Sequence, residues 1–163
     1  GGPHRAHGNV GVISHSGGLG QITVMWRAQM AGLGISYEAS CGNEADLDTL
    51  DFARFMLRSD TTDIVLMAIE GFKDGRRFMQ AARHSTKPII ALKSGVSAHG
   101  AAAAASHTGS LTGSDEVLEA AFRRSGVLRV NDIADLFNMA EALADGILKY
   151  KCEYERTGGF TRR

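Results

Sequence analysis

The sequence contains few residues that cross-link a chain and carries no net charge. Its 163 residues include 2 cysteines and 2 prolines. The cysteines, Cys41 and Cys152, form neither a metal-binding pair nor a disulfide framework, so a reducing cytoplasm is the expected compartment. The 18 Lys and Arg residues balance the 18 Asp and Glu residues. Bulk electrostatics therefore favour neither a nucleic acid nor a membrane as partner.

Long hydrophobic runs and an initiator methionine are also absent. No apolar stretch approaches the roughly 20 residues that span a bilayer, and no signal-peptide pattern precedes the first expected strand. A chain that starts Gly-Gly-Pro-His is expected to be an excised domain of a longer protein. Its length allows about two thirds of the unfolded surface to be buried without cross-links.

Short apolar runs alternate with amphipathic segments along the chain, which predicts a parallel sheet with helices on both faces. We expect an α/β, flavodoxin-like, doubly wound sheet in three layers, with about five strands in the order 2-1-3-4-5. The expected domain covers residues 9–148, between a linker (1–8) and a tail or junction to another domain (149–163). The expected strands are Asn9–Ile13, Ile35–Ala39, Asp63–Ile69, Ile89–Leu92 and Val127–Val130, and the expected helices are Leu19–Ala31, Asp46 to at least Leu57, Asp74–Ser85, Asp115–Ser125 and Asp132–Leu148.

Helix ends and core positions follow from the same pattern. Gly32 is expected to end the first helix as a left-handed cap, and Asn131 to begin the last. The second helix is expected to start near Asp46, where the carboxylates of Asp46 and Asp48 suit a helix N-terminus. Methionine and phenylalanine residues at helix or strand spacing are expected in the core: Phe52, Phe55, Met56, Met67 and Phe78.

Polar residues follow the first four expected strands. Ser14 and Ser16 come after the first, Asn43 after the second, Glu70 after the third and Lys93 after the fourth. Parallel strands place their carboxyl ends at one edge of a sheet, where ligands bind. We therefore expect these residues to lie near one another.

The turn after the first strand, Ser14 to Gly18, suits an anion because its side chains are small and it leads into a helix. Ser14, Ser16, Gly17 and Gly18 are the candidate phosphate-binding residues. A tight turn without a ligand is an equal alternative, and the turn is not a Walker loop. Ser16 half resembles a hydrolase nucleophile, but Ser14 replaces the first glycine of that motif and no acid completes a triad.

The loop from Ser94 to Gly113 is unusually long and small-sided, which indicates function or disorder. It contains His107, flanked by Ser106, Thr108 and Gly109 as supporting residues. We interpret His107 as a phosphoryl carrier. Glu70 is predicted to accept its Nδ1–H and leave Nε2 as the nucleophile, although a solvated loop acid is the ordinary alternative. No metal site is expected, and the remaining histidines have no comparable sequence context: His4, His7, His15, His84 and His99.

Five segments together resemble the succinyl-CoA ligase-like domain of NDP-forming acyl-CoA synthetases, the acetate–CoA ligase (ADP-forming) group and its relatives. The resemblance covers about residues 9 to 145. The segments are Ser14–Gly20 (SHSGGLG), Gly42–Asp46 (GNEAD), Glu70–Phe78 (EGFKDGRRF), Lys87–Gly95 (KPIIALKSG) and Ser106–Ser114 (SHTGSLTGS).

The resemblance implies that His107 is the phosphorylated histidine and Glu70 the acid that pairs with it. Whole enzymes of this type add a CoA-binding Rossmann domain, a second flavodoxin-like domain and an ATP-grasp pair. They interconvert acyl-CoA, phosphate and NDP with a small carboxylic acid, CoA and NTP. The implied cofactors are CoA and ATP or ADP with Mg²⁺, bound mostly by the other domains, so this domain is expected to be inactive alone.

The sequence departs from the family pattern at two positions. The family often has Gln where this chain has His15, and Arg where it has Val96. A different interpretation is a non-catalytic acyl-CoA-sensing module of a protein acetyltransferase fusion. Retention of both His107 and Glu70 argues against that alternative.

Overall fold

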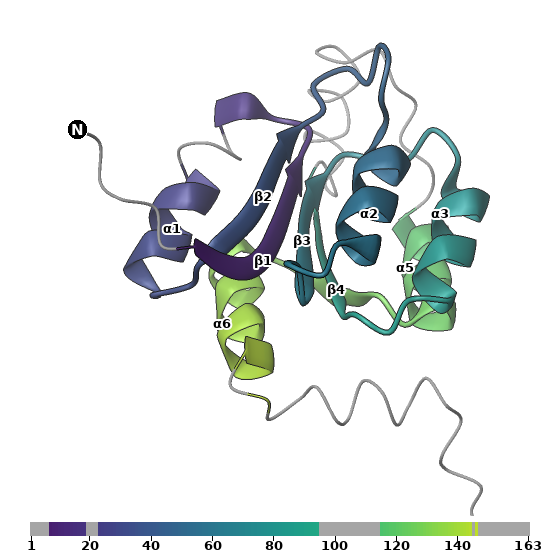
Figure 1. Ribbon diagram of the computed structural model, residues 1–163. Helices are drawn as coiled ribbons and strands as arrows, with labels where there is room; N and C mark the ends of the chain where they lie inside the picture. The colour runs from purple at the N-terminus through teal and green to yellow at the C-terminus, as the bar shows by residue number, and fades with distance from the viewer. Residues whose placement is uncertain (1–6, 19–22, 95–114, 145, 147–163) are drawn as a thin grey trace, which may run out of the picture.

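One parallel sheet of five strands organises the chain (Figure 1). The computed structural model describes residues 7–18, 23–94, 115–144 and 146. The strand order is β2-β1-β3-β4-β5 and every pairing is parallel, which confirms the expected fold class and order. The elements are β1 His7–Ser14, α1 Met25–Met30, β2 Ile35–Ser40, α2 Thr49–Arg58, β3 Ile64–Ile69, α3 Gly75–Arg83, β4 Ile89–Lys93, α5 Asp115–Ser125, β5 Leu128–Val130 and α6 Ile133–Ala144.

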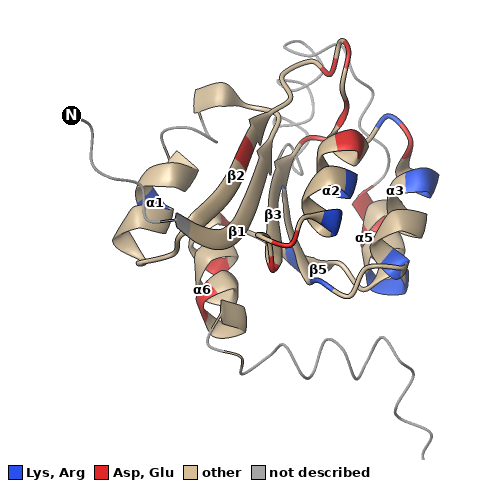
Figure 2. Ribbon diagram, in the orientation of Figure 1, with Lys and Arg blue, Asp and Glu red and all other residues tan. Residues whose placement is uncertain are grey.

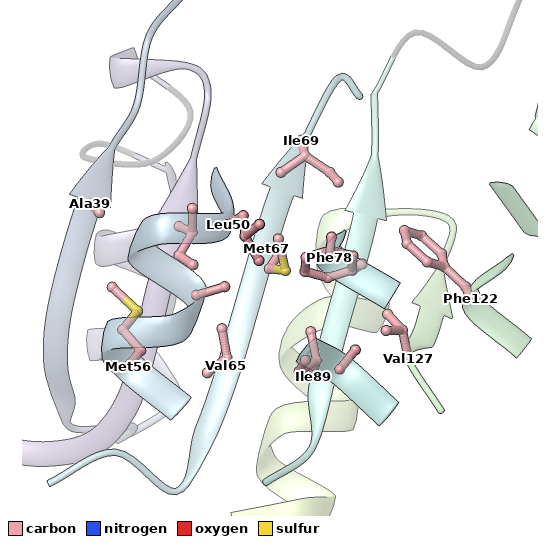
Figure 3. Packing of buried hydrophobic residues seen from close by; sticks show 14 residues of the cluster. Ala39, Leu50, Met56, Val65, Met67, Ile69, Phe78, Ile89, Phe122 and Val127 are labelled. Carbon is pink, nitrogen blue, oxygen red and sulfur yellow. The ribbon is translucent and has the colours of Figure 1, made fainter. Parts of the chain in front are cut away.

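Helices cover both faces of the sheet and give three layers. Helices α2, α3 and α5 lie on one face, where Met56, Met67 and Phe78 are buried with the strand side chains (Figure 3). Helices α1 and α6 lie on the other face and bury a second cluster. All six residues of the central strand β3 are buried, as expected for a strand covered on both sides.

Most of the expected core is confirmed, but Phe55 is not in it. Met56, Met67 and Phe78 are buried, and the partly buried Phe52 packs against the same cluster. Phe55 is 54% exposed, and its ring contacts Tyr37 edge-on with centroids 4.9 Å apart. Neighbouring residues on a helix point about 100° apart, so the burial of Met56 directs Phe55 toward the rim.

Two helix starts differ from the predicted positions. Helix α2 begins at Thr49 rather than near Asp46, and of the two expected carboxylates Asp48 is its cap: the Asp51 N–H donates to Asp48 Oδ1 at 3.0 Å, and the Asp48 N–H donates to Asp51 Oδ2 at 3.1 Å. This reciprocal pair is a capping box. At α6 the Asp135 N–H donates to Asp132 Oδ1 at 2.8 Å, so the capping side chain is Asp132 rather than Asn131.

Other segment boundaries differ modestly from expectation. Strand β1 begins at His7, so residues 7 and 8 belong to the sheet and not to the linker. Gly32 has φ +69°, as expected for a left-handed cap, whereas the predicted helix start at Leu19 lies outside the described residues. Helix α6 ends at Ala144, short of the predicted 148, and Gly146 follows in a turn. The expected tail, 149–163, lies outside the described residues.

Among the described helices, none is long and apolar enough to cross a membrane.

The strand register brings the carboxyl ends of the strands level. Ser14 lies beside Ser40 on one side and Ala68 on the other, and Ile69 lies beside Lys93. Main-chain hydrogen bonds continue past the strands, because the His15 N–H donates to the Ala68 carbonyl at 3.1 Å. The residues that follow β1, β2, β3 and β4 therefore lie along one edge, which we call the carboxyl edge.

Candidate functional site at the carboxyl edge

The hydroxyl of Ser14, a predicted phosphate ligand, forms hydrogen bonds within its own turn. It is fully buried, and its hydroxyl donates to the Ser16 carbonyl at 2.9 Å while accepting the Ser16 N–H at 3.1 Å. Ser16, Gly17 and Gly18 are exposed. A bound anion would therefore meet the main-chain N–H groups of Gly17 and Gly18 rather than the Ser14 hydroxyl or the Ser16 N–H, which bond to each other.

Glu70 lies one residue beyond β3 and is half-buried. Its Oε2 atom is buried, and within the described residues no donor reaches it. A buried polar atom left without a partner costs about 1–3 kcal/mol, so an unfilled carboxylate oxygen indicates a missing donor. The predicted donor, His107, lies outside the described residues, as do its neighbours Ser106, Thr108 and Gly109.

In the turn between β2 and α2, Glu44 is buried beside Asn43, the residue that was predicted to support the site. Asn43 is exposed, whereas Glu44 is 5% exposed and has φ +56°. Glu44 Oε1 accepts the Thr49 N–H at 2.7 Å and also accepts the Thr49 hydroxyl. The Lys73 ammonium donates to the Glu44 carbonyl. These donors hold Glu44 in the left-handed region of the backbone. That conformation is unfavourable for a residue other than glycine unless surrounding contacts hold it.

His15 joins these two acidic residues, a role that the sequence analysis missed. Its side chain is 10% exposed. Nδ1 accepts the main-chain N–H of Glu70 at 3.2 Å, while Nε2 lies 2.8 Å from Thr49 Oγ1 and 3.2 Å from Glu44 Oε1. A signal was available, because His15 is the first residue after β1 and so occupies the same edge as Glu70. Without a known partner, however, the turn acids at 44 and 46 could not be told apart.

The hydrogen bonds fix the protonation of His15. A main-chain N–H can only donate, so Nδ1 must carry a lone pair. Nε2 then carries the proton and donates to Thr49 and Glu44, while the Thr49 hydroxyl donates to Glu44. The ring is therefore a neutral imidazole with one acceptor and one donor in use.

Cys41 completes this corner of the edge as a protonated thiol. Burial raises its pKa to about 11; a hydrogen bond with Thr49 opposes the shift, and the charges of Glu44 and Asp48 add to it. A thiol in this state is a poor nucleophile and a poor metal ligand. Among the residues that the structure describes, no group of three or more His, Cys, Asp or Glu side chains could hold a metal ion.

Away from these residues, a groove of about 1360 Å³ opens between α3 and α5, and its lining includes Arg76, Arg83, Arg123 and Arg124 but no Asp or Glu. Figure 2 shows Lys and Arg (blue) around these helices and acidic residues (red) at the β2–α2 turn. The groove reaches the carboxyl edge only at Gly71 and Lys93. The polar groups at the ends of β1, β2 and β3 meet outside it, so we place the candidate site at the edge.

Comparison with known proteins agrees with the resemblance in the sequence. An acetate–CoA ligase (ADP-forming) I alpha subunit of Pyrococcus furiosus is 46% identical over 140 residues, covering 85% of this chain and 30% of that protein. A 4-hydroxybutyrate–CoA ligase (ADP-forming) of Nitrosopumilus maritimus is 36% identical over 141 residues, covering 84% of this chain and 20% of that protein. The chain thus spans about a third or less of the length of these relatives.

Solved structures give the same result. The dinucleotide forming acetyl-coenzyme A synthetase 1 of Ca. Korarchaeum cryptofilum, in complex with phosphate and ADP, superposes with a TM-score of 0.75 and 41% identity, covering 81% of this chain and 29% of that one. The family model described as the succinyl-CoA ligase like flavodoxin domain matches residues 7–143. That match spans most of the chain, so the chain belongs to the family of succinyl-CoA ligase like flavodoxin domains.

Proposed function

We propose that this chain is the phosphohistidine-carrying domain of an NDP-forming acyl-CoA synthetase. The observation that carries the proposal is Glu70 Oε2, a buried carboxylate oxygen at the carboxyl edge that no described residue fills. The relatives named above support the reaction class, since they are ADP-forming acid–CoA ligases. In this proposal the missing donor is Nδ1–H of His107.

The chemistry needs two transfers. Nε2 of neutral His107 attacks the phosphorus of an acyl phosphate, so a P–N bond forms as the P–O bond to the acyl group breaks and the carboxylate leaves. The imidazole then carries a positive charge while Nδ1 keeps its proton. Glu70 accepts a hydrogen bond from this Nδ1–H and stabilises the charge, as an orienting carboxylate does beside a catalytic histidine. In the second transfer the P–N bond breaks and the phosphoryl group passes to NDP.

The main chain of Gly17 and Gly18, with Ser16 beside it, is the proposed cradle for the phosphoryl group. The three residues are exposed, and they follow directly from a strand whose last residue, Ser14, is fixed by two hydrogen bonds. Small residues let an anion approach main-chain N–H groups closely. Ser106, Thr108, Gly109 and Asn43 are proposed as supporting residues around the histidine.

The remaining ligands belong to other domains in this proposal. CoA, ATP or ADP with Mg²⁺, and a small carboxylic acid would be bound by a CoA-binding Rossmann domain, a second flavodoxin-like domain and an ATP-grasp pair of the same enzyme. The short coverage of the relatives supports this arrangement, because most of their length lies outside the matched region.

Incubation of the complete enzyme with γ-labelled ATP and Mg²⁺ tests the proposal. We expect an acid-labile, base-stable phosphate on His107 that is absent in His107→Ala. In Glu70→Gln the rate of labelling should fall about 100-fold, because the charge on the histidine is no longer stabilised. Labelling of His107→Ala equal to that of the wild type would refute the carrier role and would favour a non-catalytic module.

A further inference from the structure

The His15 side chain connects the end of β1 to both acidic corners of the carboxyl edge. Its Nδ1 atom accepts the Glu70 N–H at 3.2 Å, and its Nε2 atom reaches Thr49 Oγ1 at 2.8 Å and Glu44 Oε1 at 3.2 Å. The ring is 10% exposed, so water competes little for these bonds. This bond ties a side chain at the end of β1 to the main chain at the end of β3.

This arrangement depends on the protonation state of the ring. A second proton would go to Nδ1, the atom that faces the Glu70 N–H, and two donors would then point at each other. The contact cannot survive this change unless the ring or the main chain moves. Imidazole side chains in general change charge between pH 5 and 8, which sets the range for a test.

The surrounding charges decide which side of the ring is held after protonation. The ionisable groups on neighbouring elements are Cys41 at the end of β2, Glu44 and Asp48 before α2, and Glu70 and Lys73 after β3. Glu44 accepts from Nε2 in either state and attracts a charged ring. Protonation therefore keeps His15 on Glu44 and releases Glu70.

We propose that neutral His15 is a positioning residue that holds the Glu70 main chain at the carboxyl edge, and that protonation of its Nδ1 atom releases Glu70 and slows phosphoryl transfer. The effect on transfer rests on the function proposed above, in which Glu70 orients His107. The contact between His15 and Glu70 does not rest on it.

A glutamine at position 15 is the matched control. Its carbonyl oxygen can accept the Glu70 N–H and its amide group can donate to Glu44, so it reproduces the donor and acceptor of neutral imidazole but does not titrate. An alanine has neither group. His15→Gln and His15→Ala therefore separate the loss of the contacts from the loss of the titration.

The test compares wild type, His15→Gln and His15→Ala in the complete enzyme. First, hydrogen exchange of the peptide containing the Glu70 amide is measured by mass spectrometry between pH 7.5 and 5.5. At each pH the wild type is compared with His15→Gln, which removes the intrinsic dependence of exchange on pH. We expect equal protection at pH 7.5 and a loss of about tenfold or more in the wild type at pH 5.5. Equal protection throughout would overturn the proposal.

Second, the rate of His107 labelling is measured over the same range. Protonation of His107, Glu70 and the nucleotide is common to wild type and His15→Gln and cancels in their ratio. We expect that ratio to fall about tenfold on acidification, and His15→Ala to be slower at every pH through kcat with little change in the nucleotide KM. A constant ratio alongside a positive exchange result would overturn the link to transfer. If no enzyme form labels His107, the proposed function fails, and the exchange measurement still decides the His15 contact.

Discussion

Two acidic residues at the carboxyl edge, Glu44 and Glu70, differ in whether their buried carboxylate oxygens receive hydrogen bonds. The Glu44 side chain is 7% exposed and Oε1 receives hydrogen bonds from Thr49 and His15. Glu70 is half-buried at the end of β3, which is separated from β2 by β1, and no described residue donates to its buried Oε2. His15 touches both, through the side chain of the first and the main chain of the second. The difference separates a carboxylate built into the fold from one whose capacity to accept hydrogen bonds is left for another group.

The largest effect should come from removing the satisfied carboxylate. Glu44→Ala leaves the Thr49 N–H and the Thr49 hydroxyl without their acceptor and removes one of the two acceptors of His15 Nε2, so we expect a loss of about 3 kcal/mol or more in the free energy of unfolding. Urea unfolding of the 163-residue chain, followed by circular dichroism, measures it. Glu44→Gln keeps an acceptor oxygen and should lose clearly less. An unchanged urea midpoint in Glu44→Ala would mean that the two acids do not differ as described.

Removing one donor of the same cluster should have a smaller effect. Thr49→Val keeps the shape of the side chain but deletes the hydroxyl that lies between His15 Nε2 and Glu44 Oε1. We expect about 1–2 kcal/mol of destabilisation in the same urea experiment. Because Thr49 and Glu44 share a hydrogen bond, the double variant should lose less than the sum of the two single losses. Strict additivity would contradict the cluster.

The fold could be predicted from sequence because it depends on repeated, local patterns. Five apolar runs separated by helical segments define the sheet, and the strand order follows from the doubly wound class. The errors were shifts of one to three positions within a helical turn, as at Phe55, at the start of α2 and at the Asp132 cap. Acidic residues crowd these helix starts, so composition alone does not say which one accepts the main-chain N–H.

The candidate site could be predicted only in outline. The carboxyl-edge rule places Glu70 and the Ser14 turn correctly relative to the strands. It does not identify His15 or Glu44, because their pairing joins residues 29 positions apart and depends on the left-handed backbone of Glu44. A charged residue at positive φ gives no local sequence signal, since glycine and asparagine are the residues expected there.

The pKa of the Cys41 thiol reports on its burial and on the charge of Glu44. Burial, aided by the Glu44 charge, raises the pKa of its thiol from 9.0 to about 11. A raised thiol pKa stabilises the folded state fully below the unfolded value, and this contribution is lost as the pH rises from about 9 to 11. In a Cys152→Ser background, thiolate absorbance should therefore develop near pH 11 in the folded chain. Development near pH 9 would contradict the burial of this thiol.

The smallest effect on stability should come from the unsatisfied carboxylate. Glu70→Gln removes a charge whose buried Oε2 has no donor within the described chain, and the amide has nearly the same shape. Relief of the buried charge offsets the new unpaired amide, so we expect the free energy of unfolding to change by less than about 0.5 kcal/mol. The same variant is expected to label His107 about 100-fold more slowly. A large loss of stability in Glu70→Gln would show that this carboxylate, like Glu44, is held by the fold, and its proposed partnership with His107 would lose its physical basis.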